Sequence, residues 1–331
     1  MKKLCILIPT YENTKALHYL IEKISKEAYD AHIDIYICDS SKTENNKQLI
    51  EAKHEAGFNN IFFLQGEITS YNNQIYDKFD EPDYKVVMAE KHLIDKYDYI
   101  WLSADGYILK IRELKDILVK FMNEDVDIIH FDDSNNDKKI IYYKDCREFY
   151  INDSWHMTKF SSAIIATPVI EKMNSQDNFR KYYGSCFLIL MSIFDYCAKH
   201  NFLAVHYNYK YCTPNPLKRA SGWILKGIAF NIFGKNWIVA NNQLPAAYDS
   251  VKSEAIINHS IKSGVFGYKN CVRLRAYKNI TVSKILKYKE LIPVITKTNL
   301  LWFWLLALIP SMFLKNIIII SDWLKSRHEN T

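Results

Sequence analysis

Glycine is scarce in this sequence, with 9 glycines among 331 residues. No G-x-G-x-x-G or G-x-x-x-x-G-K-[ST] pattern occurs, which argues against the phosphate loops of dinucleotide-binding Rossmann proteins and P-loop kinases. The seven cysteines include no C-x-x-C pair, and Cys5 and Cys38 stand in apolar stretches typical of buried thiols. We therefore expect a reducing compartment and no disulfide framework.

A long apolar run is also missing at the N-terminus. The apolar run Leu4–Ile8 follows a basic start but ends at Pro9, which is too short for the core of a signal peptide. The composition is 49% hydrophobic and 24% charged, as in globular proteins, and excludes a disordered or low-complexity chain. The length predicts two domains, or one large domain with an appendage.

The first half of the chain alternates apolar strand-like runs with helical patterns. A helix is expected from Asn13 to about Ala28 and another over Thr43–Ala56, which Gly57 closes. The expected strands are Leu4–Ile8, Ile33–Cys38, Ile61–Leu64, Tyr99–Leu102, Ile128–Phe131 and Ala163–Ala166. This order predicts an α/β fold with a mostly parallel sheet and helices on both faces.

Three acids follow these strands: Glu12, Asp39 and Asp105. In such sheets ligands bind at the carboxyl ends of the strands, so we expect the three side chains at one edge. A carboxylate there accepts hydrogen bonds from a ribose or a base, or binds a divalent cation that neutralises a diphosphate. Taken singly, each acid is better interpreted as a solvated loop carboxylate, and the ordered set carries the prediction.

The stretches ILIPTYEN, IYICDSS and DYIWLSADG, which carry these acids, resemble the nucleotide-sugar-binding half of family 2 glycosyltransferases with a GT-A (Rossmann-like) fold. The resemblance covers residues 1–210. It implies a donor site, formed by Pro9, Thr10, Tyr11, Glu12, Asp39, Ser40, Ala104 and Asp105, with Lys78 or Lys85 near the diphosphate. It also implies Mn²⁺ or Mg²⁺ on Asp105, although Ser103 replaces the first acid of the usual Asp-x-Asp.

The catalytic base of an inverting transfer is a carboxylate or another base near the acceptor hydroxyl. The family usually has an acidic pair several tens of residues after the metal turn, where this sequence has Tyr182-Tyr183-Gly184-Ser185. The base candidates are Asp153, His156 and Asp177. Each also reads as a capping, loop or packed polar group.

The C-terminal third is basic and then apolar. Between Lys262 and Lys297 there are nine basic residues and one acid, Glu290. The tail that follows contains LLWFWLLALIPSMFL, which Pro310 would kink. Such a tail fits an in-plane or re-entrant membrane anchor, a single span, or a core or oligomer-interface helix. The expected domains are 1–212 (catalytic), 213–298 (helical and basic) and 299–331 (membrane-docking).

The resemblance implies a hexosyltransferase that moves a sugar, with inversion, from a UDP-sugar to a lipid-linked saccharide in the synthesis of a bacterial capsule, exopolysaccharide or O-antigen. The tail predicts a peripheral or monotopic protein on an anionic membrane surface, at the cytoplasmic face of the bacterial inner membrane. A homo-oligomer is possible, and nucleic acid is not an expected partner. The alternative is a non-catalytic, membrane-anchored subunit that binds a sugar nucleotide or glycan. A nucleotidyltransferase would require a glycine-rich phosphate-binding loop near the N-terminus, and Pro9-Thr10-Tyr11-Glu12-Asn13 is not such a loop.

Overall fold

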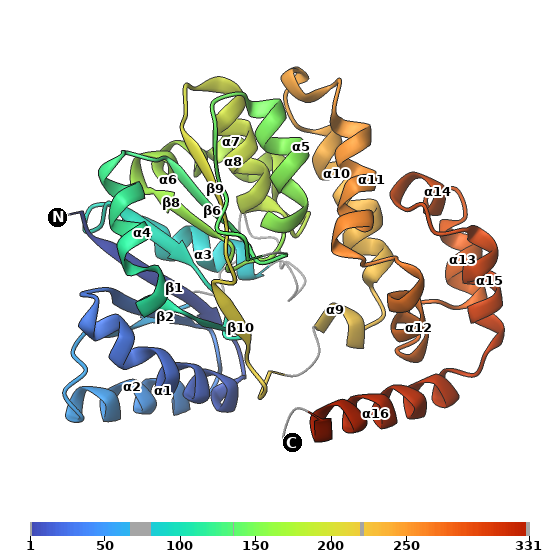
Figure 1. Ribbon diagram of the computed structural model, residues 1–331, viewed down its shortest axis with the longest axis horizontal. Coiled ribbons are helices and arrows are strands. Elements are labelled where there is room, and N and C mark those ends of the chain that lie inside the picture. The colour runs from blue at the N-terminus through green and yellow to red at the C-terminus, as the bar shows by residue number, and fades with distance from the viewer. Residues whose placement is uncertain (1, 67–80, 135, 219–221, 329–331) are drawn as a thin grey trace. The chain divides into compact units, whose positions relative to one another are not determined.

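The computed structural model describes residues 2–66, 81–134, 136–218 and 222–328 (Figure 1). The chain divides into two compact units. Unit 1 consists of Met1–Arg219 with Leu244–Tyr248, and unit 2 consists of Ala220–Gln243 with Asp249–Thr331. The whole basic segment and the whole apolar tail therefore belong to unit 2.

Unit 1 is built on an eight-stranded sheet with the order β3-β2-β1-β4-β8-β6-β9-β7. Its strands are β1 (Leu4–Thr10), β2 (Asp34–Asp39), β3 (Ile61–Gln65), β4 (Tyr99–Leu102), β6 (Ile128–Asp132), β7 (Ile140–Tyr143), β8 (Ala163–Ala166) and β9 (Ala204–Asn208). Four of the seven neighbouring pairs are parallel, and the three that involve β7 or β8 are antiparallel. The predicted α/β class with a mostly parallel sheet is confirmed.

Two short strands form a separate antiparallel ribbon, β5 (Tyr107–Leu109) with β10 (Cys212–Pro214). The helices of unit 1 are α1 (Thr14–Asp30), α2 (Asn45–Glu55), α3 (Glu81–Lys91), α4 (Ile111–Asn123), α5 (Cys146–Met157), α6 (Thr167–Met173), α7 (Gln176–Tyr182), α8 (Leu188–Lys199) and the 3₁₀ turn η2 (Ala246–Tyr248). The ribbon brings the chain after β9 back beside the turn that follows β4.

Helices cover both faces of the sheet (Figure 1). On β9 the ring of Tyr207 lies 6.0 Å from that of Phe121 of α4. The preceding residue, His206, instead hydrogen bonds with Asp153 of α5. Because successive side chains of a strand point to opposite faces, α4 and α5 lie on opposite sides of the sheet.

Glu90, near the end of α3, is a fully buried acid in the core of unit 1. Its Oε2 atom accepts a hydrogen bond of 2.7 Å from the side-chain amide of Asn174. Burial raises the pKa of Glu90 from 4.5 to about 8, and the nearby charge of Asp83 adds to this effect. Glu90 is therefore protonated in the folded protein at neutral pH.

This raised pKa predicts a stability that falls as the pH rises. Between about pH 5 and about pH 8 the folded state holds a proton that the unfolded state has released. The free energy of unfolding therefore falls by about 1.4 kcal/mol for each pH unit in this range. Glu90→Gln keeps the acceptor for Asn174 and removes the ionisation, so the fall in the free energy of unfolding should disappear. Urea denaturation at pH 5 and pH 9 checks this, with the exposed Glu171→Gln on α6 as the control. Equal pH dependence in wild type and Glu90→Gln would contradict the assignment.

Unit 2 is helical. Its elements are α9 (Gly222–Leu225), the π-helical turn η1 (Asn231–Asn236), α10 (Trp237–Asn242), α11 (Lys252–Ser263), α12 (Tyr268–Ala276), α13 (Val282–Tyr288), α14 (Ile292–Ile295), α15 (Leu300–Leu308) and α16 (Ser311–His328). The ring of Phe230 stacks on those of Phe266 and Tyr288 at centroid distances of 5.0 and 5.3 Å. Phe303 of α15 is fully buried beside Phe230, so α15 contributes to the core of this unit.

Helices α15 and α16 meet at a sharp bend next to Pro310. No single helix in the described ranges has the length and hydropathy to cross a membrane, whereas Leu300–Leu308 and Ser311–Ile318 meet these criteria as a pair bent by 96°. Arg275 donates a 2.8 Å hydrogen bond from Nε to the carbonyl of Ile309 at the break. This contact satisfies a carbonyl that the bend removes from the helical pattern.

Candidate functional site

Polar side chains gather where the parallel strands β1, β2, β4, β6 and β9 end, which is a single edge of the sheet. They form two groups. The first, which we call the donor group, consists of Thr10, Asp39, Lys85, Asp105 and Lys218. The second, the His/Asp cluster, consists of His130, Asp132, Asp133, Asp153, His156 and His206.

Asp39 ends β2 and is almost completely buried. Its Oδ1 atom accepts hydrogen bonds from the backbone and hydroxyl of Ser41 at 2.9 and 2.6 Å, and its Oδ2 atom accepts one of 2.8 Å from Asn46. The backbone N–H of Gly66 donates to the Asp39 carbonyl at 2.6 Å. These contacts fix the carboxylate at the strand end in one orientation.

Lys85 of α3 joins the ends of β1 and β2. Its ammonium donates to the carbonyl of Thr10 at 2.6 Å and to the hydroxyl of Ser40 at 2.8 Å, and the side chain is buried. A Cβ atom at position 66 would lie 2.6 Å from Cδ of Lys85, so glycine at that position leaves the room that Lys85 occupies. Lys78 lies outside the described residues.

Asp105 follows β4 and receives three side-chain donors. Its Oδ2 atom accepts from Asn13 at 2.7 Å and from Thr10 at 3.2 Å, and its Oδ1 atom pairs with the ammonium of Lys218. Asn215, three residues before Lys218, donates its side-chain amide to the Asp105 carbonyl at 2.8 Å. The predicted convergence of Thr10 and Asp105 therefore includes Lys218, which the sequence analysis did not identify.

In this structure Asp105 is surrounded by hydrogen-bond donors and an ammonium group. Both carboxylate oxygens are already engaged, one of them by a cation. Ser103, in place of a second acid, lies with its hydroxyl 3.3 Å from that of Ser161, which also accepts from the N–H of Ala104 at 3.1 Å. Within the described ranges, no group of three or more metal-ligating side chains includes Asp105. The Mn²⁺ or Mg²⁺ expected on Asp105 therefore has no ready ligand set there.

The other expected donor residues line the same edge. Pro9 pairs with Cys38 inside the sheet, Tyr11 is 42% exposed, and Ser40 is buried against Lys85. Glu12 has a left-handed backbone with φ of 49°, and its N–H donates to the Ser41 hydroxyl at 2.7 Å. The loop after β1 is thereby held against the loop after β2.

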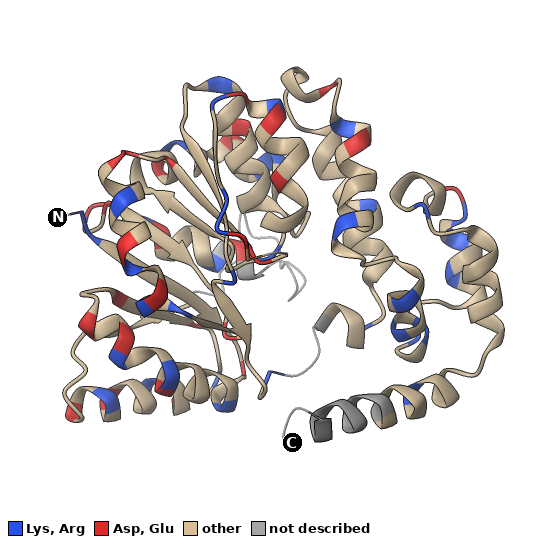
Figure 2. Ribbon diagram, in the orientation of Figure 1, with Lys and Arg blue, Asp and Glu red and all other residues tan. Residues whose placement is uncertain are grey.

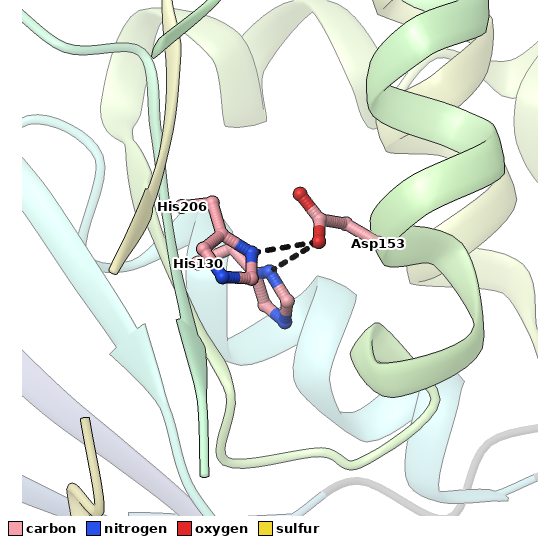
Figure 3. A group of neighbouring side chains, drawn as sticks. All are labelled: His130, Asp153 and His206. Carbon is pink, nitrogen blue, oxygen red and sulfur yellow. Dashed lines mark hydrogen bonds and ion pairs between the residues drawn. The ribbon is translucent and has the colours of Figure 1, made fainter. Parts of the chain in front are cut away.

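The His/Asp cluster joins β6, β9 and α5. His130 and His206 are direct neighbours across the parallel pair β6–β9. Nδ1 of His206 and Nδ1 of His130 lie 2.8 and 3.5 Å from the same oxygen of Asp153, as Figure 3 shows. Nε2 of His130 lies 3.0 Å from Nδ1 of His156, whose Nε2 atom lies 2.9 Å from Oδ1 of Asp133. One chain of hydrogen-bonding groups thus runs from the core to the sheet edge.

Burial and charge act in opposite directions within this cluster. Burial lowers the pKa of His130, and Asp153 only partly offsets this. Burial alone would also lower the pKa of His206, but the hydrogen bond and charge of Asp153 outweigh it and raise that pKa. Burial raises and the neighbouring histidines lower the pKa of Asp153, with a net decrease. Asp153 is therefore ionised, between two imidazoles.

The three base candidates have different surroundings. Asp153 is 1% exposed and its Oδ1 atom faces both His130 and His206, so it lies away from any acceptor. His156 reaches the edge through Asp133, which also pairs with Lys159. Asp177 is exposed in the first turn of α7 and has no hydrogen bond or ion pair to either group among the described residues. The structure thus brings Asp153 and His156 together and leaves Asp177 apart.

A hollow in unit 1 opens beside the end of α5. It is lined mainly by apolar side chains, with polar atoms from Asp83, Thr158 and Cys186. Leu102 at the end of β4 and Met157 at the end of α5 both contribute to it. The hollow therefore lies between the strand that leads to Asp105 and the helix that carries His156.

No protein-family model and no curated protein sequence matches this chain. Solved structures do: S. aureus TarS 1-349 is 11% identical over 92% of this chain and 90% of its own, with a TM-score of 0.51. A longer S. aureus TarS structure is 12% identical over 83% of this chain and 48% of its own, also with a TM-score of 0.51. A mannosyltransferase from Pyrobaculum calidifontis, in complex with GDP-Man and Mn²⁺, is 10% identical over 88% and 77%, with a TM-score of 0.48.

These similar structures are GT-A-type glycosyltransferases. At such low identity the similarity to TarS 1-349 shows the fold, a mixed α/β architecture with a mostly parallel sheet, in agreement with the resemblance stated from the sequence. TarS 1-349 has also been solved in complex with UDP and with UDP-GlcNAc.

Proposed function

We propose that the protein is a glycosyltransferase that moves a sugar from a UDP-sugar to an acceptor hydroxyl. The observation that carries the proposal is the donor group. Two features lie at the carboxyl edge of one GT-A-type sheet. The carboxylate of Asp39 is held in one orientation, suited to a base or a ribose. The ammonium of Lys218 is held by a second carboxylate, that of Asp105. The UDP choice follows the resemblance to family 2 enzymes.

In this mechanism Asp39 accepts hydrogen bonds from the nucleoside, and Lys218 lies beside the diphosphate. The acceptor oxygen attacks the anomeric carbon while the bond from that carbon to the diphosphate oxygen breaks, which inverts the configuration. The ammonium of Lys218 stabilises the negative charge that develops on the departing UDP. Asp105 positions that ammonium and makes no bond to the sugar.

His156 is the base that we propose for the acceptor proton. Its ring is held by Asp133 on one side and His130 on the other, and it ends the helix that borders the hollow. Because both ring nitrogens already have partners, Nε2 must exchange Asp133 for the acceptor hydroxyl before it takes the proton, and the adjacent carboxylate of Asp133 then stabilises the imidazolium that forms. Asp153 would then orient the cluster from behind.

Turnover tests the proposal. UDP release is measured with a panel of UDP-sugars, with and without a lipid extract containing polyprenyl-diphosphate saccharides, in EDTA, Mn²⁺ and Mg²⁺. Release that depends on one sugar nucleotide and on the extract supports the transferase. UDP binding without release under any condition favours the alternative, a non-catalytic subunit that binds a sugar nucleotide. If the protein neither binds UDP nor releases it from any UDP-sugar, the proposal is wrong.

We also propose that the acceptor is lipid-linked and that unit 2 lies on an anionic membrane at the cytoplasmic face, in the synthesis of a surface polysaccharide. Exposed apolar side chains follow one another along α15 and α16 around the bend: Leu301, Leu305, Leu308, Met312, Phe313, Ile317 and Ile320. Lysines and arginines are frequent on the helices of the same unit (Figure 2). Monotopic proteins bind anionic bilayers by inserting apolar side chains that are flanked by basic residues.

Acidic substitutions on this surface should release the protein from membranes. Leu308 and Met312 are each 74% exposed, so Leu308→Asp with Met312→Asp leaves the core of unit 2 intact. We expect sedimentation with phosphatidylglycerol vesicles to be lost while UDP binding stays. The swap Leu308→Met with Met312→Leu keeps the apolar surface and is the control. Sedimentation of the acidic variant at the wild-type level would rule out this surface, and a change in oligomeric state instead would assign it to a second copy.

A further inference from the structure

In the proposed transfer the inner half of the His/Asp cluster touches no substrate, and His130 and Asp153 only support His156 from the core. His130, Asp153 and His206 are buried on three different elements, and their side chains point toward one another in Figure 3. They lie on the β6–β9 side of the sheet, separate from Asp105. What these three residues do is therefore independent of the donor group.

Two atoms of this trio make no hydrogen bond among the described residues: Nδ1 of His130 and Oδ2 of Asp153. His130 is 0% exposed and Asp153 is 1% exposed, so solvent does not satisfy them. Buried polar atoms are almost always paired, with protein, with water or with an ion. Nδ1 of His130 lies 3.5 Å from Oδ1 of Asp153, which is beyond a good hydrogen bond, so an ion between the two side chains would satisfy both atoms better than this contact does.

We propose that His130, Asp153 and His206 bind a zinc ion. The two Nδ1 atoms and one Asp153 oxygen lie within 4.8 Å of one another, which is close enough for a common ion. The trio offers two imidazole nitrogens and one carboxylate oxygen, and a buried water molecule would complete the four ligands that Zn²⁺ prefers. Two imidazoles favour zinc over magnesium or calcium.

The surroundings also match those of a metal centre. Histidines that bind metals usually hydrogen bond through their other ring nitrogen to a polar group that fixes the ring. Nε2 of His130 contacts Nδ1 of His156 at 3.0 Å, and Nε2 of His206 lies 4.0 Å from Oδ2 of Asp132. Each ring therefore has its inner nitrogen toward Asp153 and its outer nitrogen toward the sheet edge.

The proposed ion would link α5 to the sheet. It would join one residue of the helix to one residue on each of two neighbouring strands, with no surface left open to substrate. Its role is structural, since it neutralises Asp153 and holds helix α5, which carries His156. Loss of the ion would then destabilise unit 1 before it changed the affinity of the donor group for UDP.

Metal analysis of the full chain, purified without metal-affinity resin, tests this inference. We expect about one zinc per chain by mass spectrometry of the elements, a lower melting temperature after treatment with 1,10-phenanthroline, and recovery when ZnCl₂ is added back. UDP affinity is measured in the same samples and should survive chelation. No zinc in the purified chain, together with no thermal shift on adding Zn²⁺, Co²⁺ or Ni²⁺, overturns the proposal.

Two variants locate the ion. His206→Gln removes a ligand and should lower the zinc content at least tenfold. Asp133→Asn leaves all three ligands in place and changes the neighbouring group of Asp132, Asp133 and His156, which has metal-ligand spacing of its own. Zinc lost from Asp133→Asn and retained by His206→Gln would assign the ion to the edge group and overturn the assignment. The zinc content and thermal shift of the wild-type protein test the proposal by themselves, so a variant that fails to fold does not affect the conclusion.

Discussion

Lys218→Ala should lower the rate of UDP release from the donor sugar by about 10²- to 10³-fold, the usual effect of removing a group that stabilises charge in a transition state. The ammonium of Lys218 is the cation found on Asp105, and among the described residues no group of three or more metal-ligating side chains includes Asp105. The side chain is 39% exposed, so its removal should leave the fold intact. Release kinetics with saturating UDP-sugar measure the effect.

Two control variants separate the effect of the positive charge of Lys218 from the effect of losing its side chain. Lys218→Arg keeps the charge and should retain part of the rate, whereas Lys115→Ala on α4, an exposed lysine elsewhere in unit 1, should change nothing. We also expect the wild-type rate to be the same in EDTA as in Mn²⁺. A rate that requires Mn²⁺, together with wild-type turnover by Lys218→Ala, would show that Asp105 holds a metal and that Lys218 only pairs with it in its absence.

Asp39→Asn should weaken UDP binding by about 10- to 100-fold, the range for losing hydrogen bonds to a charged group. The amide keeps the size of the carboxylate and one acceptor oxygen, but it no longer accepts on both sides and carries no charge. Inorganic diphosphate, which has no nucleoside, should bind to the variant and to wild type equally. Calorimetric titrations with UDP and with diphosphate measure the two affinities.

The matched control lies on the same strand. Asp34→Asn changes an acid at the opposite end of β2, where its carboxylate pairs with the hydroxyl of Tyr97. It should leave both affinities unchanged. If Asp39→Asn loses diphosphate as well as UDP, the residue supports the loop through Ser41 and Asn46 and does not contact the nucleoside.

The strands that end in the donor group can be predicted from the sequence because each is an apolar run that stops at a proline or a polar residue. Leu4–Ile8 and Tyr99–Leu102 were identified in this way, and both pair in the sheet as expected. The short strands β7 and β9 were missed. Their runs, Ile140–Tyr143 and Ala204–Asn208, are rich in tyrosine and histidine, and they are strands because they pair with one another and with β6.

The partners of the strand-end residues depend on contacts that are distant in sequence. Lys218 is 113 residues from Asp105, and the ribbon of β5 and β10 that brings it back has only three residues in each strand. One local signal was available for the cluster. His130 and Asp132 alternate with apolar residues in a strand, and His206 and Asn208 repeat the pattern in another, which indicates a polar face inside the protein.

The segment from Asn215 to Lys218 sets a limit on chain length. The N–H of Lys218 donates to the Asn215 carbonyl at 3.0 Å, while the Asn215 amide is tied to the carbonyls of Ala16 and Asp105, each at 2.8 Å. Lys218 therefore stands only three residues after Asn215, whose position is held by these hydrogen bonds. Relatives of this chain should tolerate insertions and deletions between Ser134 and Lys139 but keep the spacing from Asn215 to Lys218. One added residue there would move the ammonium away from Asp105 without changing any residue of the site.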